Sequence, residues 1–266
     1  MAIENTLNIA VLNCGYTCQS IQEARGQYHD LFGAILQPAV ERANRKATGS
    51  RRVKLEIKGW DTVNQVYPQS LEDIDAIIIS GSPNSAYEKL EWIQTLNRFV
   101  ADVYRNYPAI KIYGSCFGHQ VVCHALFTNN GAVVTKDPAG WELGVHSVQL
   151  TDYFVSRFPN LLDDNSLLLQ YLHADSVFFG EKLPEDVHVI GTTPQCKNQG
   201  VYQQGRLLTL QGHPEFDQFI EEECLKLVGK RVGWQETFLE DALAAARIED
   251  DASTAADIIV QFFVEG

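Results

Sequence analysis

The sequence predicts an α/β fold of the doubly wound type, in which helices cover both faces of a mostly parallel central sheet. In the first half of the chain, short aliphatic runs alternate with amphipathic segments. Strands that alternate with helices pair in parallel through right-handed crossovers. In addition, the glycine-containing turns at Gly81 and Cys116 directly follow predicted strands. Ligands of such sheets bind at the carboxyl ends of the strands, so both turns are candidate parts of a binding site.

The first half of the chain supplies the elements of this sheet. Aliphatic or alternating runs predict strands at residues 7–12, 53–57, 74–79 and 110–113. Helical spacing extends from Ser20 to Arg45, and Gly33 and Pro38 are expected to break or kink that helix. A second helix is predicted over residues 90–104, where large apolar side chains recur on one face.

The second half of the chain changes character. Short strand-like runs with few helices between them lie at residues 133–135, 145–150, 167–172, 187–192 and 200–210. They predict an antiparallel segment that covers or extends the sheet. Helical patterns follow at residues 216–228, 236–247 and 254–264. We therefore expect one domain over residues 1–266, with a core at about 7–216 and a helical C-terminal extension at about 217–266.

Composition narrows the class of protein. A chain of 266 residues with 45% hydrophobic content can bury one substantial core. The formal net charge of −13 argues against a nucleic-acid partner, because such a partner requires a basic face. No apolar run is long enough to span a membrane, and the N-terminal residues read as a strand, not as a secretory signal. The 6 cysteines form no C-x-x-C pair, which predicts reduced thiols in a cytoplasmic protein.

The turn at Cys116 has the spacing of a nucleophile held between a strand and a helix. Gly114 and Gly118 lie two residues on either side of the cysteine. On such a strained turn, side chains at these two positions would collide, so glycine is needed at both. The sulfur would lie at a helix N-terminus, which favours a thiolate, and the Phe117 amide would point toward a developing oxyanion. The alternative is a buried core cysteine in an ordinary strand–helix turn.

A cysteine nucleophile needs a base, and the base needs an orienting partner. His213 is the best-placed base, because it follows the strand-like run 207–210 and a glycine and so also lies at a strand end. Glu215 can accept a hydrogen bond from its imidazole. His119 and His124 lie on the helix after the cysteine and are expected to face away from the sulfur. These two histidines do not share one helical face with Cys116 and Cys123, so no metal site is expected.

Three strings resemble those of the class I (triad-type) glutamine amidotransferases: I-S-G-S-P at 79–83, G-S-C-F-G-H-Q at 114–120 and Q-G-H-P-E-F at 211–216. The cysteine precedes His-Pro-Glu, as in that family, whose core is flavodoxin-like. Plant γ-glutamyl peptidases share the G-S-P, C-F-G-H-Q and G-H-P-E strings. The string L-H-A-D-S-V at 172–177 looks like the H-G-D-x-V string of the glutaminase domain of GMP synthetase.

The resemblance implies a triad of Cys116, His213 and Glu215. Cys116 would attack a γ-carboxamide carbon and form a γ-glutamyl thioester. His213 would act as base and then as acid, and Glu215 would fix its tautomer. Backbone N–H groups near Gly81 and Ser82, together with that of Phe117, would form the oxyanion hole. No metal or other cofactor is implied.

The resemblance also implies three substrate-binding positions. Gln120 matches the position that contacts glutamine, Asp175 is a candidate for the α-amino group of the substrate, and His173 belongs to the same string as Asp175. Local structure offers alternatives: Gln120 as a helix-surface residue and Asp175 as a turn cap.

The sequence departs from the family pattern in two places. Ser82 stands where many members have glycine, which leaves the oxyanion hole to the backbone. No G-x-x-x-x-G-K-[ST] string is present, and the helical residues after 216 are too few for an ATP site.

Three functions remain open at this point. The first is a hydrolase of γ-glutamyl amide bonds that acts alone on glutamine or a γ-glutamyl peptide or conjugate. The second is a glutaminase subunit that supplies ammonia to a separate synthetase partner. The third is a catalytically silent scaffold or regulator that kept the fold. The absence of an ATP site favours the first, and the intact Cys-His-Glu set argues against the third.

Overall fold

The computed structural model describes residues 3–46, 51–162, 164–180 and 183–265. Within these ranges the central sheet has the strand order β2-β1-β3-β4-β12-β11-β9. Its strands are β1 (Ile3–Asn13), β2 (Arg51–Asp61), β3 (Ala76–Ile79), β4 (Lys111–Ser115), β9 (His188–Val189), β11 (Val201–Gln203) and β12 (Leu207–Leu210). The run from β2 to β12 is parallel, whereas β11 and β9 are antiparallel to their neighbours.

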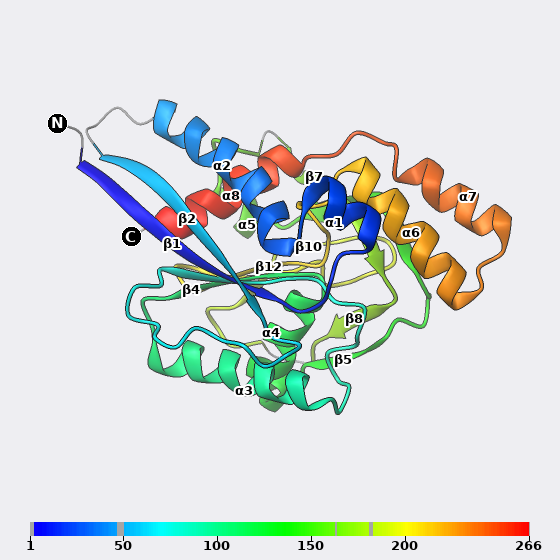
Figure 1. Ribbon diagram of the computed structural model, residues 1–266, viewed down its shortest axis with the longest axis horizontal. Helices are drawn as coiled ribbons and strands as arrows, with labels where there is room; N and C mark the ends of the chain where they lie inside the picture. Colours follow the sequence, from blue (N-terminus) through cyan, green and yellow to red (C-terminus); the bar gives the residue numbers. More distant parts are fainter. Residues whose placement is uncertain (1–2, 47–50, 163, 181–182, 266) are drawn as a thin grey trace.

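Helices cover both faces of this sheet (Figure 1). On one face lie α2 (Tyr28–Lys46) and α8 (Ala252–Val264), which share an apolar cluster with alternate residues of β1, β3 and β12. On the other face lie α3 (Glu91–Asn106) and α4 (Phe117–Phe127), which pack on the intervening residues of the same strands. The predicted doubly wound α/β fold is confirmed.

The predicted interruption of the first helical region lies elsewhere. Helix α1 (Gln19–Arg25) ends at Gly26, whose φ of 89° is one that glycine adopts readily. Helix α2 then continues through Gly33 and Pro38, so a break at these residues is wrong, while a kink there stays a prediction. Buried side chains on its inner face, such as Phe32 and Leu36, anchor the helix on the sheet. This packing outweighs the low helix propensity of glycine and proline.

The antiparallel segment of the second half both extends and covers the sheet. One small sheet contains β6 (Glu142–Leu150), β7 (Ser166–His173) and β10 (Gly191–Thr192), and another pairs β5 (Val133–Lys136) with β8 (Asp175–Phe178). One strand grouped with this segment differs, because β12 pairs in parallel with β4 inside the central sheet. The sequence reading did not identify β8, the helix α5 (Asp152–Arg157) or the short 3₁₀ turn Thr128–Asn130.

The helical end of the chain is confirmed as α6 (Gln218–Val232), α7 (Glu236–Ala245) and α8. Helix α6 packs on α1 and α7 packs on β6, while α8 belongs to the main core beside α2. The division into a core and an extension stays a prediction. All 6 cysteines are free thiols. In the described part of the chain, no helix has the length and apolar character needed to cross a lipid bilayer.

The close approach of β3, β4 and α4 depends on two glycines. A Cβ atom on Gly118 would lie 2.1 Å from the carbonyl oxygen of Ile79, and one on Gly114 would lie 2.6 Å from the carbonyl carbon of Gly118. Atoms cannot approach this closely, so any side chain at either position must push the helix away from the sheet. The collision expected from the sequence is confirmed.

Gly118→Ala is expected to lower the free energy of unfolding by about 3 kcal/mol, because the added methyl group meets backbone that cannot move aside. Urea unfolding followed by circular dichroism measures this loss. The matched control is Gly33→Ala in α2, where the nearest atom, Cδ1 of Ile57, is at 3.9 Å. That change should stabilise the protein by up to about 1 kcal/mol. Equal effects of the two substitutions would contradict the close-approach explanation.

Candidate active site

Cys116 lies on a strained turn between β4 and α4. Its φ of 51° and ψ of −105° are unusual for a residue with a side chain. The Cys116 amide donates to the carbonyl oxygen of Leu210 in β12 at 2.8 Å, which ties the turn to the neighbouring strand. Phe117 is the first residue of α4, so its N–H has no partner within the helix. The turn therefore presents a thiol and a free amide at the carboxyl end of β4.

His213 and Glu215 follow β12, the parallel neighbour of β4. Nδ1 of His213 lies 2.8 Å from Oε1 of Glu215, and both side chains are buried. The His213 amide donates to the carbonyl oxygen of Gln170 at 2.8 Å, and the ring of Phe216 stacks on the imidazole with centroids 4.0 Å apart. The carboxylate at Nδ1 leaves Nε2 available to a thiol, as in a nucleophile–base–acid arrangement.

The electrostatic environment favours the charged imidazole. Burial by itself would lower the pKa of His213. The negative charges of Cys116 and Glu215, together with hydrogen bonds to both, act in the opposite direction and raise this pKa well above its ordinary value. An imidazolium between a carboxylate and a sulfur is the state from which a thiolate nucleophile acts.

Ser115 contributes to this arrangement, although the sequence reading did not single it out. Its hydroxyl donates to the Glu215 carboxylate at 2.9 and 3.0 Å. Ser115 is the last residue of β4, and its side chain points to the side of the sheet where Glu215 lies. The alternation of side chains along a strand is the signal that could have identified it. Ser115 holds the carboxylate that orients His213.

Gly81 and Ser82 follow β3 and lie beside the same imidazole. A Cβ atom on Gly81 would lie 2.9 Å from Cε1 of His213, so glycine permits this contact. Ser82 lines the cavity next to Cys116, and its hydroxyl accepts from the Asn84 amide at 3.3 Å. The serine side chain is thus held by its own loop, and the backbone stays beside the imidazole.

A cavity of about 600 Å³ opens at these strand ends. Cys116, His213, Gln120, His173 and Asp175 all line it, so the structure brings together the catalytic and substrate-binding candidates. Gln120 is buried, which excludes the helix-surface alternative. Its Nε2 donates to the carbonyl oxygen of Asp175 at 2.9 Å and to Gln211 at 3.1 Å.

The carboxylate of Asp175 is held from across the cavity. It accepts hydrogen bonds from the hydroxyls of Ser85, at 2.5 Å, and Tyr87, at 3.2 Å. Both donors come from the loop between β3 and α3. The carboxylate therefore binds another segment of the chain instead of capping a turn, and it remains on the wall of the cavity.

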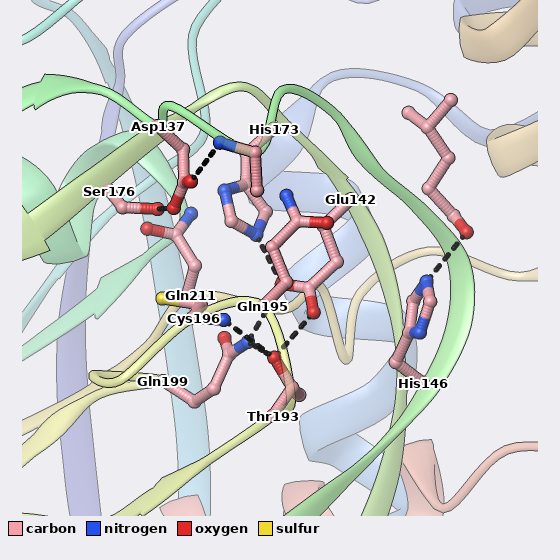
Figure 2. A network of polar contacts seen from close by, with 12 residues as sticks. Asp137, Glu142, His146, His173, Ser176, Thr193, Gln195, Cys196, Gln199 and Gln211 are labelled. Atoms are coloured by element: carbon pink, nitrogen blue, oxygen red, sulfur yellow. Dashed lines mark hydrogen bonds and ion pairs between the residues drawn. The ribbon is translucent and has the colours of Figure 1, made fainter.

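His173 is part of a buried polar network behind the cavity (Figure 2). Its Nδ1 lies 2.9 Å from the carbonyl oxygen of Asp175, and its Nε2 lies 2.9 Å from Oε2 of Glu142. Glu142 also accepts from Thr193 and Gln199. Burial would raise the pKa of Glu142, but the hydrogen bond and charge of His173 and the other donors lower it. Since both ring nitrogens already have protein partners, His173 positions residues 173–175.

His119 is held by a residue of β12, apart from the pair of His213 and Glu215. Its Nδ1 lies 2.8 Å from the hydroxyl of Thr209 under the sheet, and burial lowers its pKa to about 3. Among the residues that the structure describes, no three His, Cys, Asp or Glu side chains are arranged to hold a metal ion.

Glu221 in α6 is a buried acid that the sequence reading missed. Its side chain is fully buried, and neither carboxyl oxygen has a hydrogen-bond partner of normal geometry among the described residues. Burial is the main cause that raises its pKa to about 8; Glu215 adds to the rise, while His213 and the Gly144 amide oppose it. Glu221 lies four and eight residues before the buried Leu225 and Gly229, on the same face of α6. This spacing is the sequence signal that could have predicted its burial.

The model of the family "Glutamine amidotransferase class-I" matches residues 38–224. The chain belongs to this family. A glutamine amidotransferase-like protein of Schizosaccharomyces pombe is 32% identical, and the match covers 97% of this chain and 99% of that protein.

Two further groups of relatives agree with the resemblance seen in the sequence. Gamma-glutamyl peptidase 2 of Arabidopsis thaliana is 26% identical over 78% of this chain and 82% of its own length. The glutamine-hydrolyzing GMP synthase of Neisseria meningitidis is 30% identical over 81% of this chain but only 39% of its own length. Among solved structures, a glutamine amidotransferase from Thermotoga maritima matches with a TM-score of 0.68 at 17% identity, covering 97% of this chain and 99% of that one. The family fold is therefore shown.

Glu221→Gln is expected to stabilise the protein more at pH 8 than at pH 5. Between its ordinary value of 4.5 and its folded value of about 8, the unfolded chain releases this proton and the folded chain keeps it. Stability from this group therefore falls by about 1.4 kcal/mol per pH unit as pH rises, and glutamine removes that dependence.

Urea unfolding of both proteins across this pH range measures the difference. Glu240→Gln, which changes an exposed acid on α7, is the control and should leave the pH dependence unchanged. A constant difference between Glu221→Gln and the wild type at every pH would show that Glu221 does not hold its proton.

Proposed function

We propose that the protein hydrolyses γ-glutamyl amide bonds through a γ-glutamyl thioester on Cys116. The observation that carries this proposal is the convergence of Cys116 with the His213–Glu215 pair at the ends of adjacent parallel strands, where Cys116 and His213 line one cavity. In the first half-reaction the thiolate attacks the amide carbon, and the π electrons move to the oxygen. His213 then gives its proton to the leaving amine as the C–N bond breaks.

The second half-reaction returns the enzyme to its starting state. His213, now neutral, takes a proton from water as the water oxygen attacks the thioester carbon. The C–S bond breaks, glutamate leaves, and the thiolate faces the imidazolium again. The Phe117 amide and the Gly81–Ser82 backbone would stabilise the oxyanion in both halves. Glu215, held by Ser115, keeps the imidazole oriented throughout.

The polar end of the cavity fits the glutamyl part of the substrate. The Asp175 carboxylate is a partner for its α-amino group, and Gln120 lies between that residue and Cys116. The network through His173 and Glu142 fixes the carbonyl of Asp175 to which Gln120 is bonded. We assign Asp175 and Gln120 to substrate binding, and His173 to their positioning.

The remainder of the cavity favours a substrate larger than glutamine. A volume of about 600 Å³ is typical of sites for drug-sized ligands. Its lining also includes the apolar side chains of Ile21 in α1, Phe216, and Leu227 in α6, and the cation Arg231 one turn after Leu227. These residues support a γ-glutamyl peptide or conjugate as the substrate, with the amine-side group against the apolar side chains and Arg231 within the same lining. The γ-glutamyl peptidase relatives support the same substrate class.

A second candidate function is that of a glutaminase subunit. The GMP synthase relative is matched over only 39% of its length, so the matched part works there within a longer protein. By analogy, this chain would release ammonia from glutamine for a separate synthetase partner.

Cys116→Ala should lower release of glutamate more than about 10³-fold, because no other thiol can form the thioester. His213→Ala should lose most of the activity as well, since it removes the proton transfer of both half-reactions. The assay follows free glutamate and amine from glutamine, glutathione and a glutathione S-conjugate. The proposal predicts fastest turnover of the conjugate by the protein alone.

Two matched variants control for loss of structure. Cys123→Ala removes a buried thiol of the same helix whose pKa burial raises far above its usual value, and His188→Ala removes a histidine at the sheet edge. Both should keep most of the activity. Slow turnover of glutamine alone would favour the glutaminase subunit. Normal turnover by Cys116→Ala would overturn the assignment, and a Cys116 inert to a glutamine-like electrophile would favour the silent scaffold.

A further inference from the structure

Tyr28 is an aromatic residue of the cavity that the catalytic scheme has not used. It is the first residue of α2, is 8% exposed, and lines the same cavity as Cys116 and His213. A Cβ atom on Gly81 would lie 3.7 Å from the Tyr28 hydroxyl oxygen and 2.9 Å from Cε1 of His213. The hydroxyl and the imidazole therefore lie beside the same backbone segment, Gly81–Ser82.

The hydroxyl of Tyr28 has no hydrogen-bond partner among the residues that the structure describes. Buried tyrosine hydroxyls usually have one. The hydroxyl oxygen is not fully buried, and Tyr28 lines the cavity. The oxygen therefore lies at the cavity surface. A donor placed there can bond an atom of a bound substrate. Among the described residues, no hydrogen bond within the protein competes for it.

The environment keeps this hydroxyl protonated. Burial is the main cause that raises the pKa of Tyr28 well above its ordinary value, and the negative charge of Glu215 adds to the effect. Tyr28 is therefore a neutral hydrogen-bond donor at neutral pH. A neutral hydroxyl suits hydrogen bonding to an oxyanion, and it leaves acid–base transfer to His213.

We propose that Tyr28 is a catalytic residue that donates a hydrogen bond to the oxyanion of the tetrahedral intermediate. This proposal rests on the proposed γ-glutamyl hydrolase function. As the sulfur bonds to the amide carbon, the charge that develops on oxygen is met by the Phe117 amide, the Gly81–Ser82 backbone and the Tyr28 hydroxyl. No proton is transferred to or from Tyr28. Its hydrogen bond is strongest when the oxygen is fully charged, so it stabilises the transition state more than the bound substrate.

The alternative role of Tyr28 is packing alone. Its ring lies in a small apolar cluster with Ile21, Leu31, Phe216 and Ile220. Tyr28→Phe retains this ring and removes only the hydroxyl oxygen, so it separates the two roles. A purely structural ring predicts no change in turnover.

The test compares Tyr28→Phe with the wild type in the full chain. With a γ-glutamyl anilide as substrate, kcat should fall by about 10- to 100-fold, while KM should change little. Alkylation of Cys116 by iodoacetamide, followed on the Cys116 peptide by mass spectrometry, should proceed at the wild-type rate. Alkylation requires the thiolate but forms no oxyanion. The control is Tyr107→Phe, which makes the same substitution at an exposed tyrosine after α3 and should leave kcat unchanged.

The outcomes separate this proposal from the function on which it rests. If the wild type cleaves the substrate and Tyr28→Phe cleaves it at the same rate, the proposed role of Tyr28 is overturned. The hydrolase function would still stand. Slowing of alkylation in parallel with kcat would also overturn it, because the hydroxyl would then act on the thiol–imidazole pair. If the wild type cleaves no γ-glutamyl compound while Cys116 still alkylates, the proposed function and the role of Tyr28 are both overturned.

Discussion

The positive-φ turn at Cys116 is the constraint on which the rest of the structure depends. The turn is tight because α4 packs directly on the end of β3, with the Gly118 Cα facing the carbonyl of Ile79. This contact brings the residues after β3, β4 and β12 to one edge of the sheet, so Gly81, Cys116 and His213 meet. The strain at one residue is maintained by the packing of the surrounding strands and helix, as at functional sites generally.

Two buried acid–histidine pairs fix opposite parts of the cavity. Glu215 holds His213 beside Cys116, and Glu142 holds His173 beneath Asp175. A buried carboxylate without its partner is strongly unfavourable, so each pair resists displacement once it is formed. In the proposed mechanism the first pair carries the proton transfers, and its His213 lines the cavity. The other has both ring nitrogens bound within the protein and serves to fix the backbone of residues 173–175.

Local signals were sufficient for the parallel sheet and for the proximity of Cys116, His213 and Glu215. The glycines around Cys116 and the short His-Pro-Glu string act within a few residues, and the parallel pairing of neighbouring strands brings the strings together. Other features depend on contacts between distant segments. Helix α2 passes through Gly33 and Pro38 because of packing on the sheet. Glu221 is the first of three successive glutamates, a pattern that predicts exposure, and it is buried only because other elements pack over it. Tyr28 is recognisable only when α2 is seen beside Gly81.

The two ends of the cavity differ in how firmly they are built, and this difference bears on specificity. The polar end is held by a chain of buried hydrogen bonds from Gln120 through Asp175 and His173 to Glu142, so it suits one invariant group. The lining from α1 and α6 is mostly apolar but includes Arg231, and Leu227 in it is 54% exposed. Apolar contact is non-directional and tolerates changes of shape. For the proposed hydrolase this predicts strong discrimination at the glutamyl end and weaker discrimination at the amine end. The Tyr28 hydroxyl, in its proposed role, would then act on the amide bond common to such substrates.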